Sequence, residues 1–215
     1  MTEFNQPRLA NVWGKISGES DSSHSESIYA ALLAYYQESQ RSYHNTNHIH
    51  ECLCYADRLS ELPGYSEEVE IAIWFHDAIY LAGAQDNERK SMEWFTACAD
   101  GHFGEQPIGE IQQLIMATDH KHMPTTLSQK LIVDIDLSGF SSERERFIAD
   151  GKKIRAEYSH VPDDEFIRDQ TNFLNRLLDR PSIYSTDHFM QHNEQIARSN
   201  IHYLLNTYSK GIQPW

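Results

Sequence analysis

Residues 69–81, VEIAIWFHDAIYL, form the most apolar segment of the chain, and two polar residues, His76 and Asp77, interrupt it. A helix that is apolar on nearly every face belongs in a protein core. An unpaired carboxylate there would cost several kcal/mol, roughly, and a bare imidazole somewhat less. A bound divalent cation would compensate both groups, because it supplies the opposite charge and takes their lone pairs. The segment therefore predicts a buried core helix that carries metal ligands.

Three other segments contain residues that can complete such a site. They are Arg41–His50 with His48, Ala117–His122 with His120, and Leu131–Leu137 with Asp136. His48 and His76 with Asp77 and Asp136 would give two imidazoles and two carboxylates, a mixed nitrogen and oxygen ligation. This donor set suits Mn, Fe, Ni, Co or Zn better than Ca, while Mg stays possible.

In chain order these motifs resemble the HD superfamily of metal-dependent phosphohydrolases, and in particular its small stand-alone bacterial proteins. The shared blocks, which cover about residues 41 to 140, are Tyr-His-Asn-x-x-His-Ile, Trp-Phe-His-Asp-Ala-x-Tyr, an Asn-Glu pair, Ala-Thr-x-His and Asp-x-Asp-Leu-Ser.

The resemblance implies roles for individual residues. The implied metal ligands are His48, His76, Asp77 and Asp136. His120 would bind a second ion or donate a hydrogen bond to the transferred phosphate, and Lys121 stands beside it. Glu88, two positions after Asp86, falls where relatives carry an acidic pair that positions the attacking water. The implied catalytic residues are Asp77, Glu88 and His120.

Arg41 and His44 precede the helix that carries His48, at an end where backbone N–H groups favour anions. We assign both to the phosphate of a substrate, together with Lys121. Other interpretations stay open: His44 can bond to the backbone, Glu88 can be an acidic residue of a helix start, and Lys121 can be a solvated surface residue.

Periodic apolar residues predict an all-α fold. The expected helices are 28–36, 49–62, 92–98, 108–116, 143–158, 164–178 and 188–208, and the serine-rich stretch 17–27 is expected to be a loop. Residues 133–137 alternate with period two, so the pattern alone does not separate strand from helix, and the resemblance implies a helix. In the C-terminal third we expect a salt network of Arg155, Glu157 and Arg198.

A length of 215 residues suits a single domain, which we divide into a core of about residues 28–140 and a helical extension of about 141–210. With 18 basic and 32 acidic residues the net charge is −14, which disfavours polymeric nucleic acid and anionic membranes but allows a small phosphorylated substrate. No long apolar run or leader-like start is present, and three cysteines cannot all pair, so we expect a cytoplasmic protein with no membrane partner.

These observations together predict a metal-dependent phosphohydrolase that acts on a small phosphorylated metabolite such as a nucleotide, by means of a metal-activated water. Two alternatives stay open. One is a di-iron oxygenase on the same scaffold, and the other is a non-catalytic protein that binds metal or nucleotide.

Overall fold

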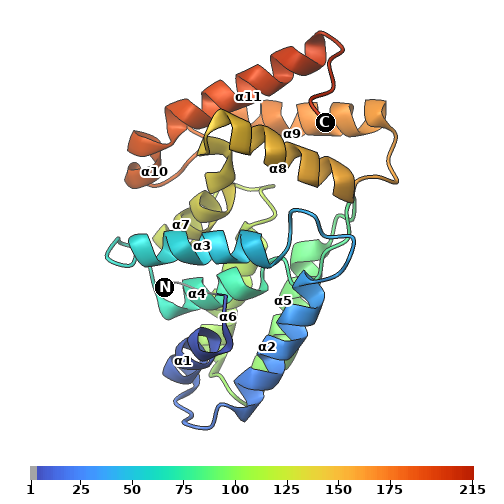
Figure 1. Cartoon of the computed structure of the whole chain (residues 1–215). Helices are drawn as coiled ribbons and strands as arrows, with labels where there is room; N and C mark the ends of the chain where they lie inside the picture. The colour runs from blue at the N-terminus through green and yellow to red at the C-terminus, as the bar shows by residue number, and fades with distance from the viewer. Residues whose placement is uncertain (1–3) are drawn as a thin grey trace. The chain divides into compact units, whose positions relative to one another are not determined.

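The structure, a computed structural model, describes residues 4–215, and these residues form eleven α-helices and one 3₁₀ helix (η1) without any strand (Figure 1). The predicted all-α class is confirmed. In chain order the elements are α1 (Gln6–Ser17), α2 (Ser23–Tyr36), α3 (Thr46–Arg58), α4 (Glu67–Phe75), α5 (Asn87–Ala99), α6 (Glu105–Ala117), α7 (Leu127–Asp136), η1 (Leu137–Ser141), α8 (Arg144–Glu157), α9 (Asp163–Leu178), α10 (Asp187–His192) and α11 (Glu194–Ser209).

The chain forms two compact units, of which the first ends at Ile135 and the second covers Asp136–Trp215. The division into a core and an extension within one domain, with a boundary near residue 140, stays a prediction. The first unit starts earlier than the expected core, because α1 packs against α2 and α4. Leu9, Val12 and Trp13 are the residues that α1 buries.

Helix α4 is the central element of the first unit, in contact with α1, α3, α5 and α6. All residues from Val69 to Phe75 are buried, as the apolar segment predicts. The helix begins at the Ser66 N-cap, whose side chain accepts a hydrogen bond from the backbone N–H of Val69. The prediction is wrong about the other end, because α4 stops at Phe75 and a turn follows. His76 and Asp77 lie in that turn.

Several other helix ends differ from expectation. The loop expected over 17–27 ends early, since α2 begins at Ser23, and the helix expected over 188–208 is broken at Asn193 into α10 and α11. The implied helix through Asp136 is present as α7. Its start lies against Gly64, which has a φ of +100° and where a Cβ would come within 2.7 Å of the Leu127 backbone. Only glycine suits that position.

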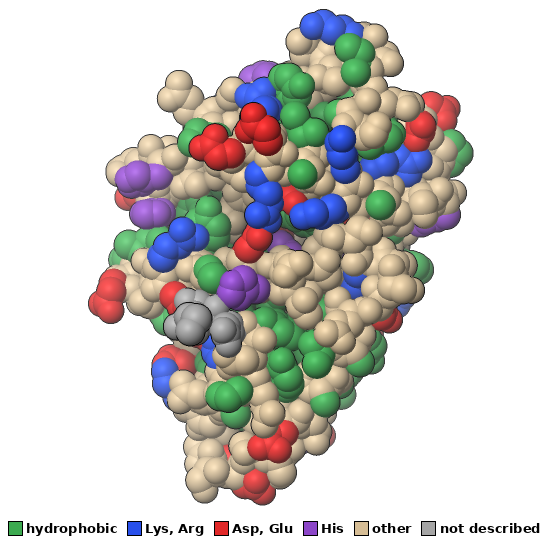
Figure 2. Space-filling view, in the orientation of Figure 1, with side chains coloured by type: hydrophobic (Ala, Val, Ile, Leu, Met, Phe, Trp, Pro, Cys, Tyr) green, Lys and Arg blue, Asp and Glu red, His purple; other side chains and the backbone are tan. Residues whose placement is uncertain are grey.

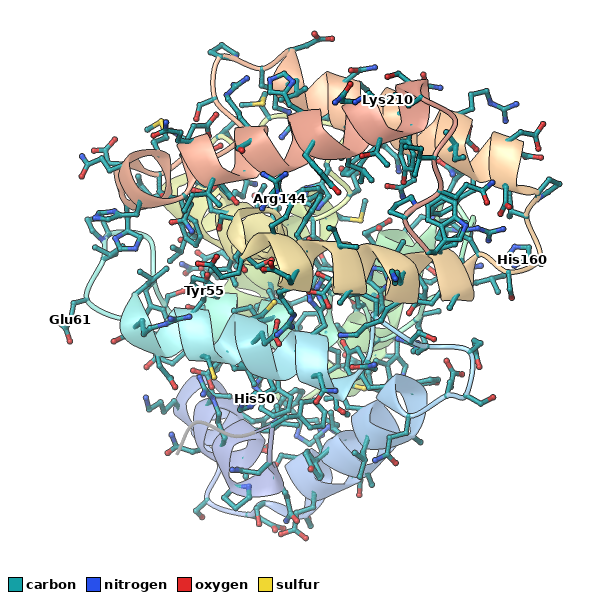
Figure 3. The ribbon with its side chains drawn as sticks, turned by 45° about the horizontal axis from the view of Figure 1, so that its top comes forward. His50, Tyr55, Glu61, Arg144, His160 and Lys210 are labelled. Atoms are coloured by element: carbon teal, nitrogen blue, oxygen red, sulfur yellow. The ribbon has the colours of Figure 1, made fainter. Side chains whose placement is uncertain are left out.

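In the second unit α11 packs against η1, α9 and α10. Arg144, labelled at the start of α8 in Figure 3, donates from Nε to the side-chain oxygen of Asn200. The expected single salt network is wrong: Arg155 pairs with Asp163 in the α8–α9 region, whereas Arg198 pairs with Glu194 at the start of α11. Each arginine braces a different part of the unit.

On the face drawn in Figure 2, acidic and basic side chains are interspersed rather than gathered by sign. Across residues 4–215, every helix is too short or too polar to pass through a bilayer.

Candidate metal centre

The turn after α4 buries both polar residues that interrupt the apolar segment: His76 is 2% exposed and Asp77 is 8% exposed. The Nδ1 atom of His76 lies 3.0 Å from the carbonyl oxygen of Ile73. A carbonyl can only accept, so Nδ1 must carry the hydrogen of that bond. In the neutral ring the lone pair is then on Nε2, the nitrogen that lies close to His48 and Asp77.

A second imidazole faces this nitrogen from α3. The helix starts at the Asn45 N-cap, whose side chain accepts a hydrogen bond from Asn47, and its buried face carries His48. The Nε2 atoms of His48 and His76 are 3.3 Å apart. A carboxylate oxygen of Asp77, Oδ2, lies 3.2 Å from the His76 Nε2 and 3.5 Å from the His48 Nε2. Three donor atoms therefore form a triangle with nearly equal edges.

The edges of this triangle can be compared with known coordination geometry. Two ligands of a tetrahedral ion, at about 2.0 to 2.1 Å from it, are separated by about 3.3 to 3.4 Å. The measured edges of 3.2, 3.3 and 3.5 Å match that separation. The spacing of these three donor atoms is thus compatible with one divalent transition-metal ion.

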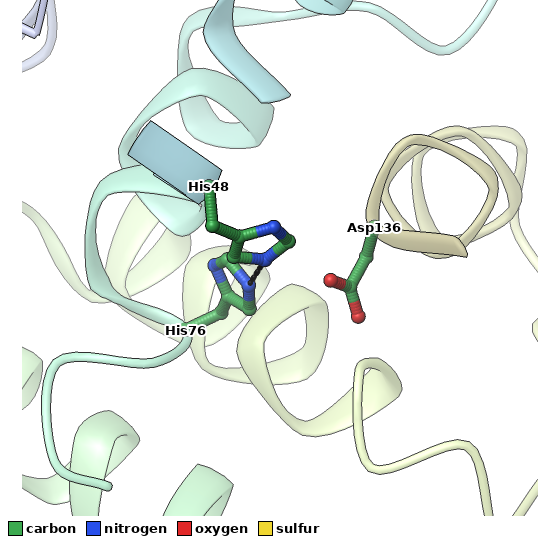
Figure 4. A group of neighbouring side chains, drawn as sticks. All are labelled: His48, His76 and Asp136. Atoms are coloured by element: carbon green, nitrogen blue, oxygen red, sulfur yellow. Dashed lines mark hydrogen bonds between the residues drawn. The ribbon is translucent and has the colours of Figure 1, made fainter. Parts of the chain in front are cut away.

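Asp136, the last residue of α7, adds a further carboxylate. Its oxygen and the ring nitrogens of His48 and His76 all lie within 4.8 Å of one another, and Figure 4 shows the carboxylate turned toward the two rings. Within residues 4–215, His48, His76 and Asp136 thus form a group of three side chains that could hold a metal ion. The four ligands expected from the sequence therefore come together, His48, His76 and Asp136 as a group and Asp77 beside both histidines.

The electrostatics of the turn favour an ionised Asp77. Burial by itself would raise the pKa of this carboxyl. In the absence of a cation, protonated His76 supplies positive charge and a hydrogen bond to Asp77. With the charges of His44 and His48, these outweigh burial and hold the pKa of Asp77 well below the ordinary value. Asp77 is therefore ionised at neutral pH.

Glu88, in the first turn of α5, shows the opposite behaviour. Burial raises its pKa above the ordinary value, and the negative charge of Asp77 adds to this effect, while Lys121 and His120 oppose it. Asp77, His120 and Lys121 thus all lie close enough to act on Glu88. A carboxyl with a raised pKa can hold a proton nearer to neutral pH, which is a property of general acids and bases.

His120 and Lys121 occupy the turn after α6. His120 has a φ of 56°, the only positive value at a residue other than glycine within 4–215, so the backbone there is strained. The Nζ of Lys121 lies 3.3 Å from the carbonyl oxygen of Gln85, in the loop that leads to α5. This contact joins the turn to the segment before Glu88.

The two residues expected to bind phosphate at the start of α3 have different surroundings. His44 stacks on the ring of Tyr80, with centroids 4.1 Å apart, and its charge acts on Asp77. The side chain of Arg41 is only 1% exposed and is hydrogen-bonded inside the protein, to Glu38 and to backbone carbonyls. The phosphate contact stays a prediction for His44, whereas the contacts of Arg41 are internal.

Two positioning contacts were not expected from the sequence. The side chain of Asn87 both accepts from the N–H of Leu81 and donates to its carbonyl, at 3.0 and 3.1 Å. The hydroxyl of Ser91 accepts from the N–H of Ile79 at 3.0 Å. Both tie the segment after Asp77 to α5. The Asn-Glu pair in the sequence hinted at Asn87, but no pattern marks a loop clamp of this kind.

Comparisons with protein-family models, with curated proteins and with solved structures find no match to this chain. The resemblance to the HD superfamily therefore depends on the sequence motifs, and the donor geometry is an independent observation.

Proposed function

We propose that the protein is a metal-dependent phosphohydrolase that acts on a small phosphorylated metabolite, with nucleotides as the favoured class. The observation that carries the proposal is the triangle of donor atoms from His48, His76 and Asp77, whose edges of 3.2 to 3.5 Å fit one ion. Such a cluster of neutral and anionic donors, buried among apolar helices, is difficult to explain without a cation.

In this proposal His48, His76, Asp77 and Asp136 hold the ion, with Mn, Fe, Ni, Co, Zn or Mg as the candidates. A bound divalent cation would lower the pKa of water and withdraw charge from a phosphoryl oxygen. The side chains around the centre supply the remaining functions.

Glu88 is the proposed general acid or base. In hydrolysis an O–P bond forms to water, the ester P–O bond breaks, and the leaving oxygen takes up a proton. The raised pKa of Glu88 allows its carboxyl to take the proton from water or to give one to the leaving oxygen. Lys121 would place positive charge near a phosphate, and His120 would donate a hydrogen bond to it or bind a second ion.

The substrate is proposed to be small for an electrostatic reason. A chain with a net charge of −14 repels a polyphosphate backbone over long distances, whereas a cation in one site attracts a single phosphate locally. We place the protein in the cytoplasm, with which the three free cysteines agree.

The test is anaerobic purification and metal analysis, followed by a screen of phosphorylated metabolites for phosphate release with each candidate ion. Asp77→Ala should abolish turnover, and His202→Ala, a change of an exposed histidine on α11, should leave it unchanged. Two irons per chain with oxygen uptake would indicate the oxygenase instead. Ligand-induced thermal stabilisation without turnover would indicate a binding protein.

A further inference from the structure

Arg41 makes an unusual set of contacts for a charged residue. Its Nε donates to the carboxylate of Glu38 at 2.9 Å, one terminal nitrogen donates to the carbonyl oxygen of Asp77 at 2.6 Å, and the other donates to that of Ala78 at 2.8 Å. The first terminal nitrogen also lies 3.3 Å from the carbonyl oxygen of His44. The guanidinium is thus buried but supplied with acceptors on every side.

Aromatic rings enclose the same guanidinium. Its carbon lies 5.3 Å from the ring centre of Tyr36 and 5.7 Å from that of Tyr80. The hydroxyl of Tyr36 donates to the carbonyl oxygen of Trp74 at 3.0 Å. Tyr36 therefore binds a carbonyl in the last turn of α4, and Arg41 binds carbonyls just after the helix. These carbonyls have no hydrogen-bond partner within the helix. A cation at a helix C-terminus is also favoured by the helix dipole.

These contacts lie at the C-terminal end of α4 and in the turn that follows it. The helix stops at Phe75, and the carbonyls that Arg41 binds belong to Asp77 and its successor, in the turn that presents His76 and Asp77. The bond to His44 connects this turn to the segment that leads into α3 and His48. One side chain therefore touches the backbone of both segments that supply the donor triangle.

We propose that Arg41 is a positioning residue, which fixes the spacing between the histidines and Asp77 and so sets the affinity of the centre for its ion. The inference rests on the metal centre of the proposed function but not on hydrolysis. Lysine cannot replace Arg41, because one ammonium has no planar fork to reach separate carbonyls and a carboxylate together.

Arg8 offers a matched control. It is also largely buried, with a side chain 14% exposed, and it also binds α4, through a 2.8 Å bond from Nε to Glu70. A terminal nitrogen of Arg8 binds Asp57 at 2.9 Å. These contacts are made at Glu70 of α4 and at Asp57 near the end of α3, six positions along the chain from His76 and nine from His48. Loss of Arg8 should therefore lower stability without a change at the centre.

The experiment measures Mn²⁺ affinity by calorimetric titration, and the visible absorption spectrum of the Co²⁺ form, for wild type, Arg41→Lys and Arg8→Lys. Arg41→Lys should weaken Mn²⁺ binding by about 10- to 100-fold, as is typical for loss of groups that orient metal ligands, and should alter the Co²⁺ spectrum. Arg8→Lys should lower the melting temperature and keep the affinity and spectrum of wild type.

Wild-type affinity and an unchanged spectrum in Arg41→Lys would overturn the proposed role, as would an equal loss of affinity in Arg8→Lys. If Arg41→Lys does not fold, Glu38→Gln is tested in its place. The side chain of Glu38 is 36% exposed, so this substitution is mild, and it changes only one partner of the guanidinium. That variant should weaken binding by about 2- to 10-fold. A wild-type protein that binds neither ion would overturn the centre itself, whereas binding without turnover would contradict hydrolysis alone.

Discussion

The substitution Asp77→Asn gives a quantitative test of the centre, because it keeps the shape of the side chain and removes its charge. Asp77 Oδ2 contributes two of the three edges of the donor triangle, at 3.2 and 3.5 Å from the histidine nitrogens. Groups that merely orient metal ligands are worth about 10- to 100-fold in affinity. We therefore expect direct replacement of a ligand to weaken Mn²⁺ binding by at least about 100-fold.

The expected change in stability follows from linkage. An ion at 100 times its dissociation constant stabilises the folded protein by about 2.7 kcal/mol, and at a concentration equal to the constant by about 0.4 kcal/mol. For a chain of 215 residues, these values correspond to melting shifts of about 5 to 11 °C and about 1 to 2 °C. The first range applies to wild type and the second to Asp77→Asn.

The assay is differential scanning calorimetry of each protein with and without Mn²⁺ at 100 times the wild-type constant. Because each protein is compared with its own metal-free form, any effect of the substitution on the metal-free fold cancels. Equal shifts in wild type and Asp77→Asn would refute the assignment of Asp77 as a ligand, and the absence of a shift in wild type would refute the centre.

Three further predictions concern the surroundings of the centre and the fold. The pKa of Glu88 is raised, so the folded state binds this proton more tightly than the unfolded state, and stability is lost as the pH rises. Glu88→Gln should therefore raise the melting temperature at pH 8 and have little effect at pH 4. A stabilisation confined to pH 4 would contradict the burial of this carboxyl beside Asp77. Gly64→Ala should destabilise the protein by about 1 to 3 kcal/mol in urea unfolding, because it combines a φ of +100° with a clash at Leu127, and a neutral result would contradict this close approach. His120→Asn introduces a residue type that tolerates the left-handed backbone at φ 56°, so the free energy of unfolding in urea should change little. Phosphate release should fall by about 100-fold. Unchanged turnover would contradict a chemical role for His120.

Much of the fold was predictable from the sequence because the signals are local. The apolar run 69–75 with a serine before it marks both the burial and the start of α4. The end of α4 was not predictable, because His76 and Asp77 continue the helical pattern of the sequence. The carbonyls at and just after the end of the helix are bound by Tyr36 and Arg41, which lie more than thirty positions earlier in the chain. Such a helix end depends on tertiary contacts rather than on propensity.

The candidate site shows the same division between local and distant information. The polar pair inside an apolar segment was sufficient to predict that His76 and Asp77 are buried, and their role as metal ligands stays a prediction. Arg41 was assigned to substrate because its place before α3 suits an anion, but its guanidinium lies inside the protein on backbone carbonyls. A sequence does not reveal which way a side chain at a helix start turns, and that direction decides between binding a phosphate and bracing a turn.

The most direct measurement of the central claim is the anomalous scattering of a crystal grown with Mn²⁺ or Zn²⁺. The account predicts one strong peak at about 2.0 to 2.2 Å from the Nε2 atoms of both His48 and His76, with a carboxylate oxygen of Asp77 in contact. A fully bound ion located elsewhere, or an ordered triangle of these side chains without a peak at saturating metal, would contradict it.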